Sequence, residues 1–488
     1  MPLRTKMIFT SSQFVIFISV FFLLYWVVFN RSYKLQNILL LAGSYTFYAY
    51  WDWRFLFLLI CSSAVNYFLG LGISKSAKEK YRVVYLWLGM LQGLGCLLFF
   101  KYFNFFVGSF KNAFPLISGR FDLHTLNIIL PLGISFYTFR TISYLLDIKS
   151  MKVKATSDWV VFFSYVSFFP CLLAGPIDRP KTLIPQLETK RKFNYLQASD
   201  GMRQVLWGVF KKMVIADNCA AFTNHVFDHY KTSPASALLL AAFLYTIQIY
   251  ADFSGYSDIA IGVSNLIGFK VTRNFNFPFF SQNIADFWRR WNISLTSWLT
   301  DYVFTPLSIY FRDYGKMGLV ISILINFTLI GIWHGANWTF IIFGFLHGCY
   351  YIPLIIGGKL NKKGKLLIGE RLSLTTLLKI TGTFLLVMFT FVIFRSDSIR
   401  QAFEYFERIF SLSLFSTIEI KEKVNLFAAL ICIVIMLWAE WRQRDKQHAL
   451  QIDSIPNSSS RAFIYVVLIV LVLCFSATKN TDFIYFKF

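Results

Sequence analysis

Long apolar segments recur along almost the whole chain, and most approach the roughly 20 residues that a helix needs to cross a bilayer. They cover 8–29, 35–52, 54–73, 83–109, 126–146, 157–175, 204–217, 236–267, 317–333, 338–357, 373–394, 423–439 and 461–478. Only 15% of residues are charged, against roughly 25% in a soluble globular chain. Because the alternating pattern of a membrane barrel is missing, these segments must be helical. We therefore expect an all-α, multi-pass integral membrane protein with about 11 to 13 membrane-embedded helices, some of them short or re-entrant.

The formal net charge of +23 comes from basic clusters between the apolar segments, at Lys75–Arg82, Lys190–Lys192, Lys359–Lys365 and Arg442–Lys446. Cytoplasmic loops of membrane proteins collect lysine and arginine in this way. The basic excess thus predicts topology, and no polar basic surface of the kind that binds nucleic acid is present. The seven cysteines form no CxxC pair, so we interpret them as packing residues and expect neither a disulfide framework nor a metal site.

We expect one membrane-embedded domain over residues 1–488, with its characteristic motifs between about 100 and 350 and its last helices and tail at 373–488. The segment 268–308 is rich in Phe, Trp and Arg and has no clean apolar span. It is typical of amphipathic elements that lie at the membrane surface or dip into it.

A polar pentapeptide, Trp333–Asn337, separates two uncharged apolar runs, Met317–Ile332 and Trp338–Ile356. An imidazole in such surroundings is costly to leave without a partner or a task. Together the runs suffice for two crossings, which puts His334 at the break between them. We predict that His334 is a catalytic base; the alternative is that it hydrogen-bonds a neighbour and joins two helices. For His347, further along, we favour a supporting role over direct catalysis.

A second polar stretch runs from Asp286 to Leu295 and contains Arg289 and Arg290 between tryptophans. Such a pattern suits a helix at headgroup depth. The same arginine pair can also hold the phosphates of an anionic donor. Asn292, two residues later, can orient an imidazole or a substrate carbonyl.

Two carboxylates, Asp252 and Asp258, lie in an otherwise apolar run. Carboxylates in a membrane helix are costly and need partners. They can pair with Arg289 or Arg290, or line a water-filled path. Internal ion pairing is at least as well supported as direct participation in catalysis.

The chain ends with Asp482–Phe488, a heptapeptide with four aromatic residues. Aromatic residues anchor membrane proteins at the interface, but a phenol such as that of Tyr485 can also act as a nucleophile. If the basic loop at 442–446 is cytoplasmic, the final span carries this tail to the opposite face.

Together these stretches resemble the membrane-bound O-acyltransferase family, and in particular its bacterial branch that modifies alginate and other polymers. The matching segments occur in order along the chain: Pro131–Phe139, Phe169–Ile177, Trp207–Lys212, Tyr250–Asp258, Phe287–Leu299 and Trp333–Trp338. The resemblance implies a multi-helix fold around a central tunnel. A thioester donor would enter the tunnel from the cytoplasm, and the acyl group would leave toward the outside.

The resemblance also implies residue roles. His334 matches the catalytic histidine of the family's Trp-His-Gly motif. The second signature position, commonly His in this branch and Asn in others, is Asn292, so a mechanism with two imidazoles at these positions is excluded. The tail is similar to a short motif whose tyrosine, here Tyr485, receives the acyl group before an extracytoplasmic transferase takes it. The candidate donor and substrate contacts are Arg289, Arg290, Trp333, Asn337, Asp252, Asp258 and His347.

From residues and resemblance together we predict an O-acyltransferase of the bacterial cytoplasmic (inner) membrane that O-acylates a cell-envelope or exported polysaccharide. Acetyl-CoA is the expected donor, or another acyl-CoA or acyl-carrier thioester. We expect no tightly bound cofactor, and we expect membrane lipid and an extracytoplasmic acyltransferase as partners. The rival hypothesis is a transporter or flippase that uses Asp252, Asp258 and Arg140 as a substrate path without covalent chemistry.

Overall fold

The computed structural model describes residues 7–114, 125–360, 373–418, 423–477 and 483–484. Every regular element among them is a helix, which confirms the all-α prediction. The chain forms two compact units. One consists of Met1–Met202 with Ala260–Thr272, and the other of Arg203–Ile259 with Arg273–Phe488.

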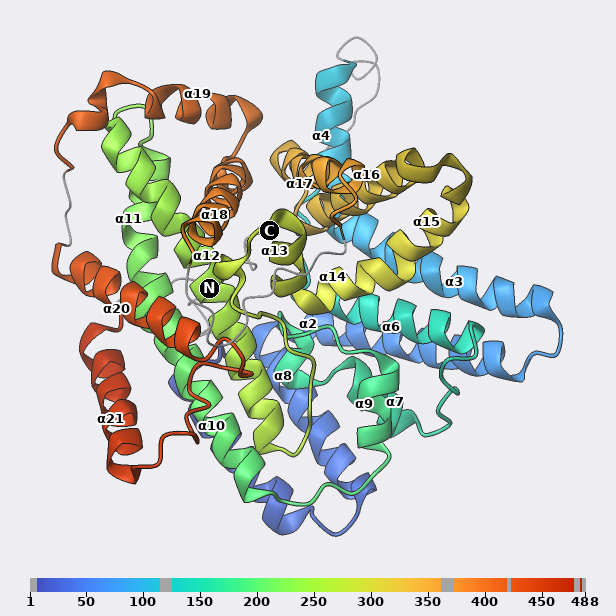
Figure 1. Cartoon of the computed structure of the whole chain (residues 1–488). Coiled ribbons are helices and arrows are strands. Elements are labelled where there is room, and N and C mark those ends of the chain that lie inside the picture. The colour runs from blue at the N-terminus through green and yellow to red at the C-terminus, as the bar shows by residue number, and fades with distance from the viewer. Residues whose placement is uncertain (1–6, 115–124, 361–372, 419–422, 478–482, 485–488) are drawn as a thin grey trace. The chain divides into compact units, whose positions relative to one another are not determined.

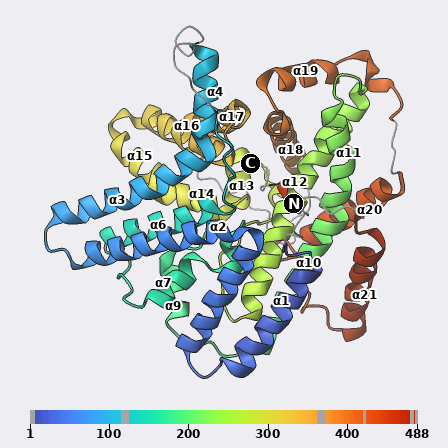
Figure 2. The same cartoon turned by 180° about the vertical axis from the view of Figure 1, so that it is seen from behind.

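The first unit contains α1 (Ser12–Leu23), α2 (Tyr33–Lys75), α3 (Glu79–Leu97), α4 (Phe103–Ala113), α6 (Ile134–Lys149), α7 (Trp159–Val166), α8 (Phe169–Leu172) and α9 (Pro180–Leu187). The two apolar runs expected at 35–52 and 54–73 are the two limbs of α2, which bends where Asp52 leaves helical geometry (φ −157°, ψ 109°). Helices α2, α3 and α6 lie side by side (Figure 2).

Arg140 of α6 is fully buried in this unit. Its guanidinium donates to the carbonyl oxygens of Tyr165 and Val166, at 3.3 and 3.2 Å, and to that of Pro176 at 3.4 Å. These carbonyl groups bind both terminal nitrogens of the buried guanidinium, and only its Nε has no hydrogen-bond partner among the described residues. The contacts therefore favour a structural role for Arg140 over a place on a transport path.

The second unit contains α11 (Asp217–Asp228), α13 (Ile284–Arg290), α14 (Ile293–Leu299), α15 (Thr305–Tyr310), α16 (Gly315–His334), α17 (Trp338–Ile356), α18 (Leu374–Arg395), α19 (Ile399–Ile409), α20 (Lys423–Arg442) and α21 (Ser458–Phe475). Helices α10 (Tyr195–Val209) and α12 (Ala235–Leu266) contribute to both units, and a π-helical segment, Phe210–Ala216, joins α10 to α11. Helices α16 and α17 form a hairpin and lie side by side in Figure 1.

Within the described ranges, eight helical segments are long and apolar enough to cross a membrane: Tyr33–Lys75, Glu79–Lys111, Ala235–Leu266, Arg312–His334, Trp338–Ile356, Leu374–Arg395, Val424–Arg442 and Ser458–Phe475. The apolar helix Ser12–Val28 is shorter. The expected total of about 11 to 13 also counted interfacial and re-entrant pieces, and the segment 268–308 indeed forms only short helices. The structure is therefore that of a multi-pass membrane protein.

Helix α19 is amphipathic and lies outside these spans. Its Glu404 accepts hydrogen bonds from the hydroxyl of Tyr230 and from Nε of Arg400. These two donors lower the pKa of the Glu404 carboxyl, because they stabilise its charged form.

Candidate functional site

The predicted break at the polar pentapeptide is present in the structure. Helix α16 ends at His334, and α17 starts at Trp338. Asn337 caps α17, since its side-chain oxygen accepts from the amide of Thr339 at 3.2 Å and its Nδ2 donates to the carbonyl of Asp397 at 2.8 Å. This capping arrangement supports a structural role for Asn337.

His334 is 3% exposed, and its ring lies among aromatic side chains. Its centroid is 4.9 Å from that of Trp333, 5.1 Å from that of Phe394 and 5.9 Å from that of Phe343, all edge-on. Because His334 is the last residue of α16, it sits at the negative end of the helix dipole. That end stabilises the imidazolium that forms when the ring accepts a proton.

Glycines bring α16 and α17 into backbone contact beside His334. A Cβ on Gly331 would lie 2.2 Å from the carbonyl oxygen of Phe340, and one on Gly344 would lie 2.2 Å from that of Phe327. Small residues allow this close approach between membrane helices, where packing replaces the hydrophobic effect. The position of His334 is therefore set by a contact that tolerates no added side chain.

The second imidazole of the hairpin, that of His347, is fully buried and has both nitrogens engaged. Nε1 of Trp288 lies 3.1 Å from Nδ1, and Oγ1 of Thr390 lies 3.0 Å from Nε2. An indole N–H can only donate. Nδ1 must therefore be the acceptor, and the ring is neutral with its proton on Nε2, where it donates to the Thr390 hydroxyl. That hydroxyl in turn donates to the carbonyl of Val387 at 2.8 Å.

This hydrogen-bond chain supports the supporting role favoured for His347. To accept a proton the ring would have to break the bond from Trp288. The hydrogen bonds from Trp288 to His347 and from His347 to Thr390 tie α13 to α17 and α18, and so fix the segment that carries Asn292.

Asn292 precedes α14 in the left-handed conformation (φ 45°, ψ 52°), which asparagine tolerates better than most residues. It is 2% exposed, and its Nδ2 has no hydrogen-bond partner among the described residues. Within the described residues, Asn292 makes no hydrogen bond with His334 or His347. A buried amide N–H without an acceptor is unusual in a folded protein and marks a position where a ligand oxygen can bind.

The two arginines of this stretch differ in their surroundings. Nε of Arg290 pairs with the Asp286 carboxylate at 3.1 Å, and its side chain is largely buried. Arg289 is exposed and donates to the carbonyl of Leu360 at 2.5 Å. Of the pair, Arg289 is thus the one available to an anionic ligand.

Asp252 and Asp258 take part in internal ion pairs, but their partners are lysines rather than Arg289 or Arg290. Lys211 reaches Asp258 at 2.7 Å, and Lys212 reaches Asp252 at 2.8 Å. The structure thereby joins two of the sequence motifs, Trp207–Lys212 and Tyr250–Asp258.

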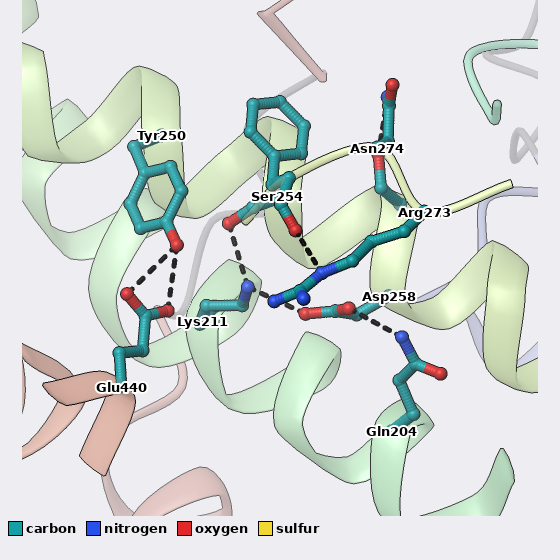
Figure 3. Close-up of polar contacts among 10 residues, drawn as sticks. Gln204, Lys211, Tyr250, Ser254, Asp258, Arg273, Asn274 and Glu440 are labelled. Atoms are coloured by element: carbon teal, nitrogen blue, oxygen red, sulfur yellow. Dashed lines mark hydrogen bonds and ion pairs between the residues drawn. The ribbon is translucent and has the colours of Figure 1, made fainter. Parts of the chain in front are cut away.

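Figure 3 shows the first of these pairs with its neighbours. Asp258 also accepts from Gln204 at 2.8 Å, and Lys211 donates to Ser254 at the same distance. Nearby, the hydroxyl of Tyr250 contacts both carboxylate oxygens of Glu440 at 2.9 Å. Charged groups within membrane helices are expected to be paired in this way.

Lys211, Lys212 and Glu440 were not predicted as partners of these side chains, although both lysines belong to the Trp207–Lys212 motif. A signal for each was present. Lys211 and Lys212 interrupt an apolar segment, and Glu440 is the single acidic residue of α20.

The tail is described only in part. Tyr485 lies outside the described residues, but Phe483 and Ile484 are buried against α12. In the described part of the chain, no group of three or more His, Cys, Asp or Glu side chains could hold a metal ion.

Comparison with known proteins identifies the chain. The model of the membrane-bound O-acyltransferase family matches residues 45–354. The chain belongs to this family. It is therefore an integral membrane O-acyltransferase that uses an acyl donor, as predicted.

Curated relatives of this acyltransferase cover most of its length. It is 33% identical over 503 positions to the probable alginate O-acetylase AlgI of Pseudomonas putida, which covers 99% of this chain and 100% of that protein. It is 37% identical to the probable alginate O-acetylase AlgI of Pseudomonas aeruginosa, over 85% of this chain and 77% of the relative. It is also 34% identical to the peptidoglycan O-acetyltransferase of Helicobacter pylori, over 70% and 69% respectively.

Proposed function

We propose that this acyltransferase takes an acetyl group from acetyl-CoA at the bacterial inner membrane and passes it on for O-acetylation of an exported or cell-envelope polysaccharide. Its relatives include a probable alginate O-acetylase and a peptidoglycan O-acetyltransferase, which supports this substrate class. The observation that carries the mechanism is the buried His334 at the end of α16, where aromatic rings surround its imidazole.

In the proposed reaction a hydroxyl oxygen attacks the thioester carbonyl carbon, and the carbon–sulfur bond breaks. His334 takes the hydroxyl proton as general base and returns it to the departing thiolate. The buried Nδ2 of Asn292 donates to the carbonyl oxygen of the thioester, where negative charge develops. The exposed Arg289 binds the donor phosphates.

The attacking hydroxyl is, in this proposal, that of Tyr485. A phenol ester formed there would carry the acyl group until an extracytoplasmic acyltransferase moves it to the polymer. The aromatic tail and its expected position outside the cytoplasm support this step.

The test uses purified protein reconstituted in lipid, with acetyl-CoA as donor and release of free thiol as the readout. His334→Ala should lose at least about 100-fold in turnover, the usual share of a general base. His229→Ala, which removes an exposed histidine of the same unit, is the matched control. Turnover of His334→Ala close to that of the wild type would refute the assignment.

The relay has a separate test. Tyr485→Phe should keep the thermal stability of the wild type and still bind donor, yet abolish acetylation of the polymer in cells. Unchanged polymer acetylation would exclude the relay while leaving the base assignment intact.

A further inference from the structure

The last described residues of the tail dock on α12, and we infer that Asp252 is the anchor that holds them there. This inference rests on the proposed function for its purpose, because an anchored tail fixes the chain one residue before Tyr485. Asp252 is thus a positioning residue that binds the tail rather than the acyl donor.

The first contact is a hydrogen bond to the backbone. The amide of Ile484 donates to Oδ2 of Asp252 at 2.7 Å, and both groups are buried. A carboxylate makes a stronger acceptor than a neutral oxygen, and burial removes the competition from water. Because the donor is a backbone amide, the bond fixes the register of the tail irrespective of the side chain at 484.

The second carboxylate oxygen is used in a different way. Oδ1 of Asp252 lies 2.8 Å from Nζ of Lys212, which also contacts Asp217 at 2.7 Å. One lysine therefore stands between two buried carboxylates. The two oxygens of Asp252 thus face two different donors, the ammonium group of Lys212 and the amide of Ile484.

An aromatic contact lies beside the polar one. The ring of Phe483 stacks on that of Tyr256 with centroids 4.7 Å apart, and it meets Phe253 edge-on at 5.8 Å. Asp252 and Tyr256 are four residues apart and share one face of α12. This face therefore offers an acceptor for the backbone and a platform for the preceding side chain.

The stem of the tail is held as well. Nδ2 of Asn218 donates to the carbonyl of Phe475, the last residue of α21, at 2.7 Å. Asn218 directly follows Asp217, so the same turn of α11 contacts both Phe475 and Lys212, the lysine that pairs with Asp252.

The anchor requires a carboxylate, because its two oxygens each face a donor. In Asp252→Asn one oxygen becomes an NH2 group, which would face either Lys212 or the amide of Ile484. The variant is isosteric, yet it must lose one of the two contacts. Asp258→Asn is the matched control, since Asp258 lies on the same helix in a similar lysine pair but contacts neither described tail residue.

Hydrogen–deuterium exchange of the intact protein in detergent gives a readout that needs no acyl transfer. We expect the C-terminal peptide containing Ile484 to exchange about tenfold faster in Asp252→Asn, since a hydrogen bond to a charged group is worth at least that factor. Asp258→Asn also leaves a buried lysine without its counter-charge, so it controls for general destabilisation, and its C-terminal peptide should accelerate no more than its other peptides do. Equal acceleration in both variants, or none in Asp252→Asn, would overturn the anchor.

Cross-linking tests the same contact if Asp252→Asn folds poorly. Cysteines replacing Tyr256 and Phe483 should be joined by a short bis-maleimide in the otherwise unchanged protein, and absence of a cross-link would overturn the docking. For function, Asp252→Asn should lower kcat for polymer acetylation without changing KM for acetyl-CoA. A raised KM would instead make Asp252 a donor-binding residue and contradict the inference. If Asp252→Asn releases the tail in the exchange experiment but acetylates the polymer at the full rate, the relay through Tyr485 is refuted, and the anchoring role of Asp252 is still supported.

Discussion

Adding one methyl group to Gly344 should separate α16 from α17 and disable the enzyme. The new Cβ would lie 2.2 Å from the carbonyl oxygen of Phe327, where ordinary contacts begin at 3.4 Å. A backbone carbonyl cannot swing away, so the helices must part by about 1 Å. Such overpacking costs about 1–3 kcal/mol. A displacement of this size at a reacting group lowers turnover by about 100-fold.

The assay compares Gly344→Ala with Gly382→Ala in reconstituted protein. Gly382 lies in α18, and a Cβ there would meet nothing within 4 Å, so its alanine variant should keep full activity and gain slightly in stability. Thiol release from acetyl-CoA reports turnover, and thermal unfolding in detergent reports stability. If Gly344→Ala unfolds at the wild-type temperature and turns over at the wild-type rate, the close contact does not position His334 and the reasoning fails.

Three further outcomes are expected. Thr390→Val should lower the free energy of unfolding by about 1–3 kcal/mol, because the Nε2–H of His347 loses its acceptor; Thr390→Ser, which keeps the hydroxyl, should unfold like the wild type. Asp258→Asn should cost about 3 kcal/mol by leaving Lys211 buried without its counter-charge, and adding Lys211→Met should recover most of this loss in a chemical-denaturation series. At pH values above the ordinary pKa of a glutamate, about 4.3, Glu404→Gln should lower the unfolding temperature. The difference from the wild type should vanish as the pH falls through the lowered pKa of Glu404, because the contacts that lower this pKa stabilise only the charged carboxylate of the folded protein. A constant difference across this pH range would contradict the assigned contacts.

The sequence predicted the features that depend on local pattern. Apolar length and the missing alternation gave the helices, and the polar interruption at Trp333–Asn337 gave the break that ends α16 at His334. The break between the apolar runs 35–52 and 54–73 is present as well, because Asp52 leaves helical geometry between the two limbs of α2. The pattern did not predict how short this break is, since the two limbs meet at one extended residue without a loop.

The ion-pair partners of the two carboxylates in α12 were harder to predict, because they depend on which residues lie close together in the folded chain. Asp252 and Asp258 plainly needed cations, and the nearest arginines in the predicted site were reasonable candidates. The actual cations, Lys211 and Lys212, are about 40 residues away in sequence. They reach the carboxylates because Gly208 and Gly255 allow α10 and α12 to touch, with a Cβ on Gly208 only 2.5 Å from the Gly255 carbonyl.

The π-helical segment Phe210–Ala216 has a consequence for how this chain can vary. One additional residue per turn lets two consecutive lysines serve two different carboxylates of α12. Deleting a single residue there would close the wide turn into an ordinary helical one, so Lys211 and Lys212 would no longer project toward the same two carboxylates. At least one of the two ion pairs would then be lost. Changes in the length of this segment should therefore be tolerated far less than substitutions. In a library of single-codon deletions, functional variants should be missing at 210–216.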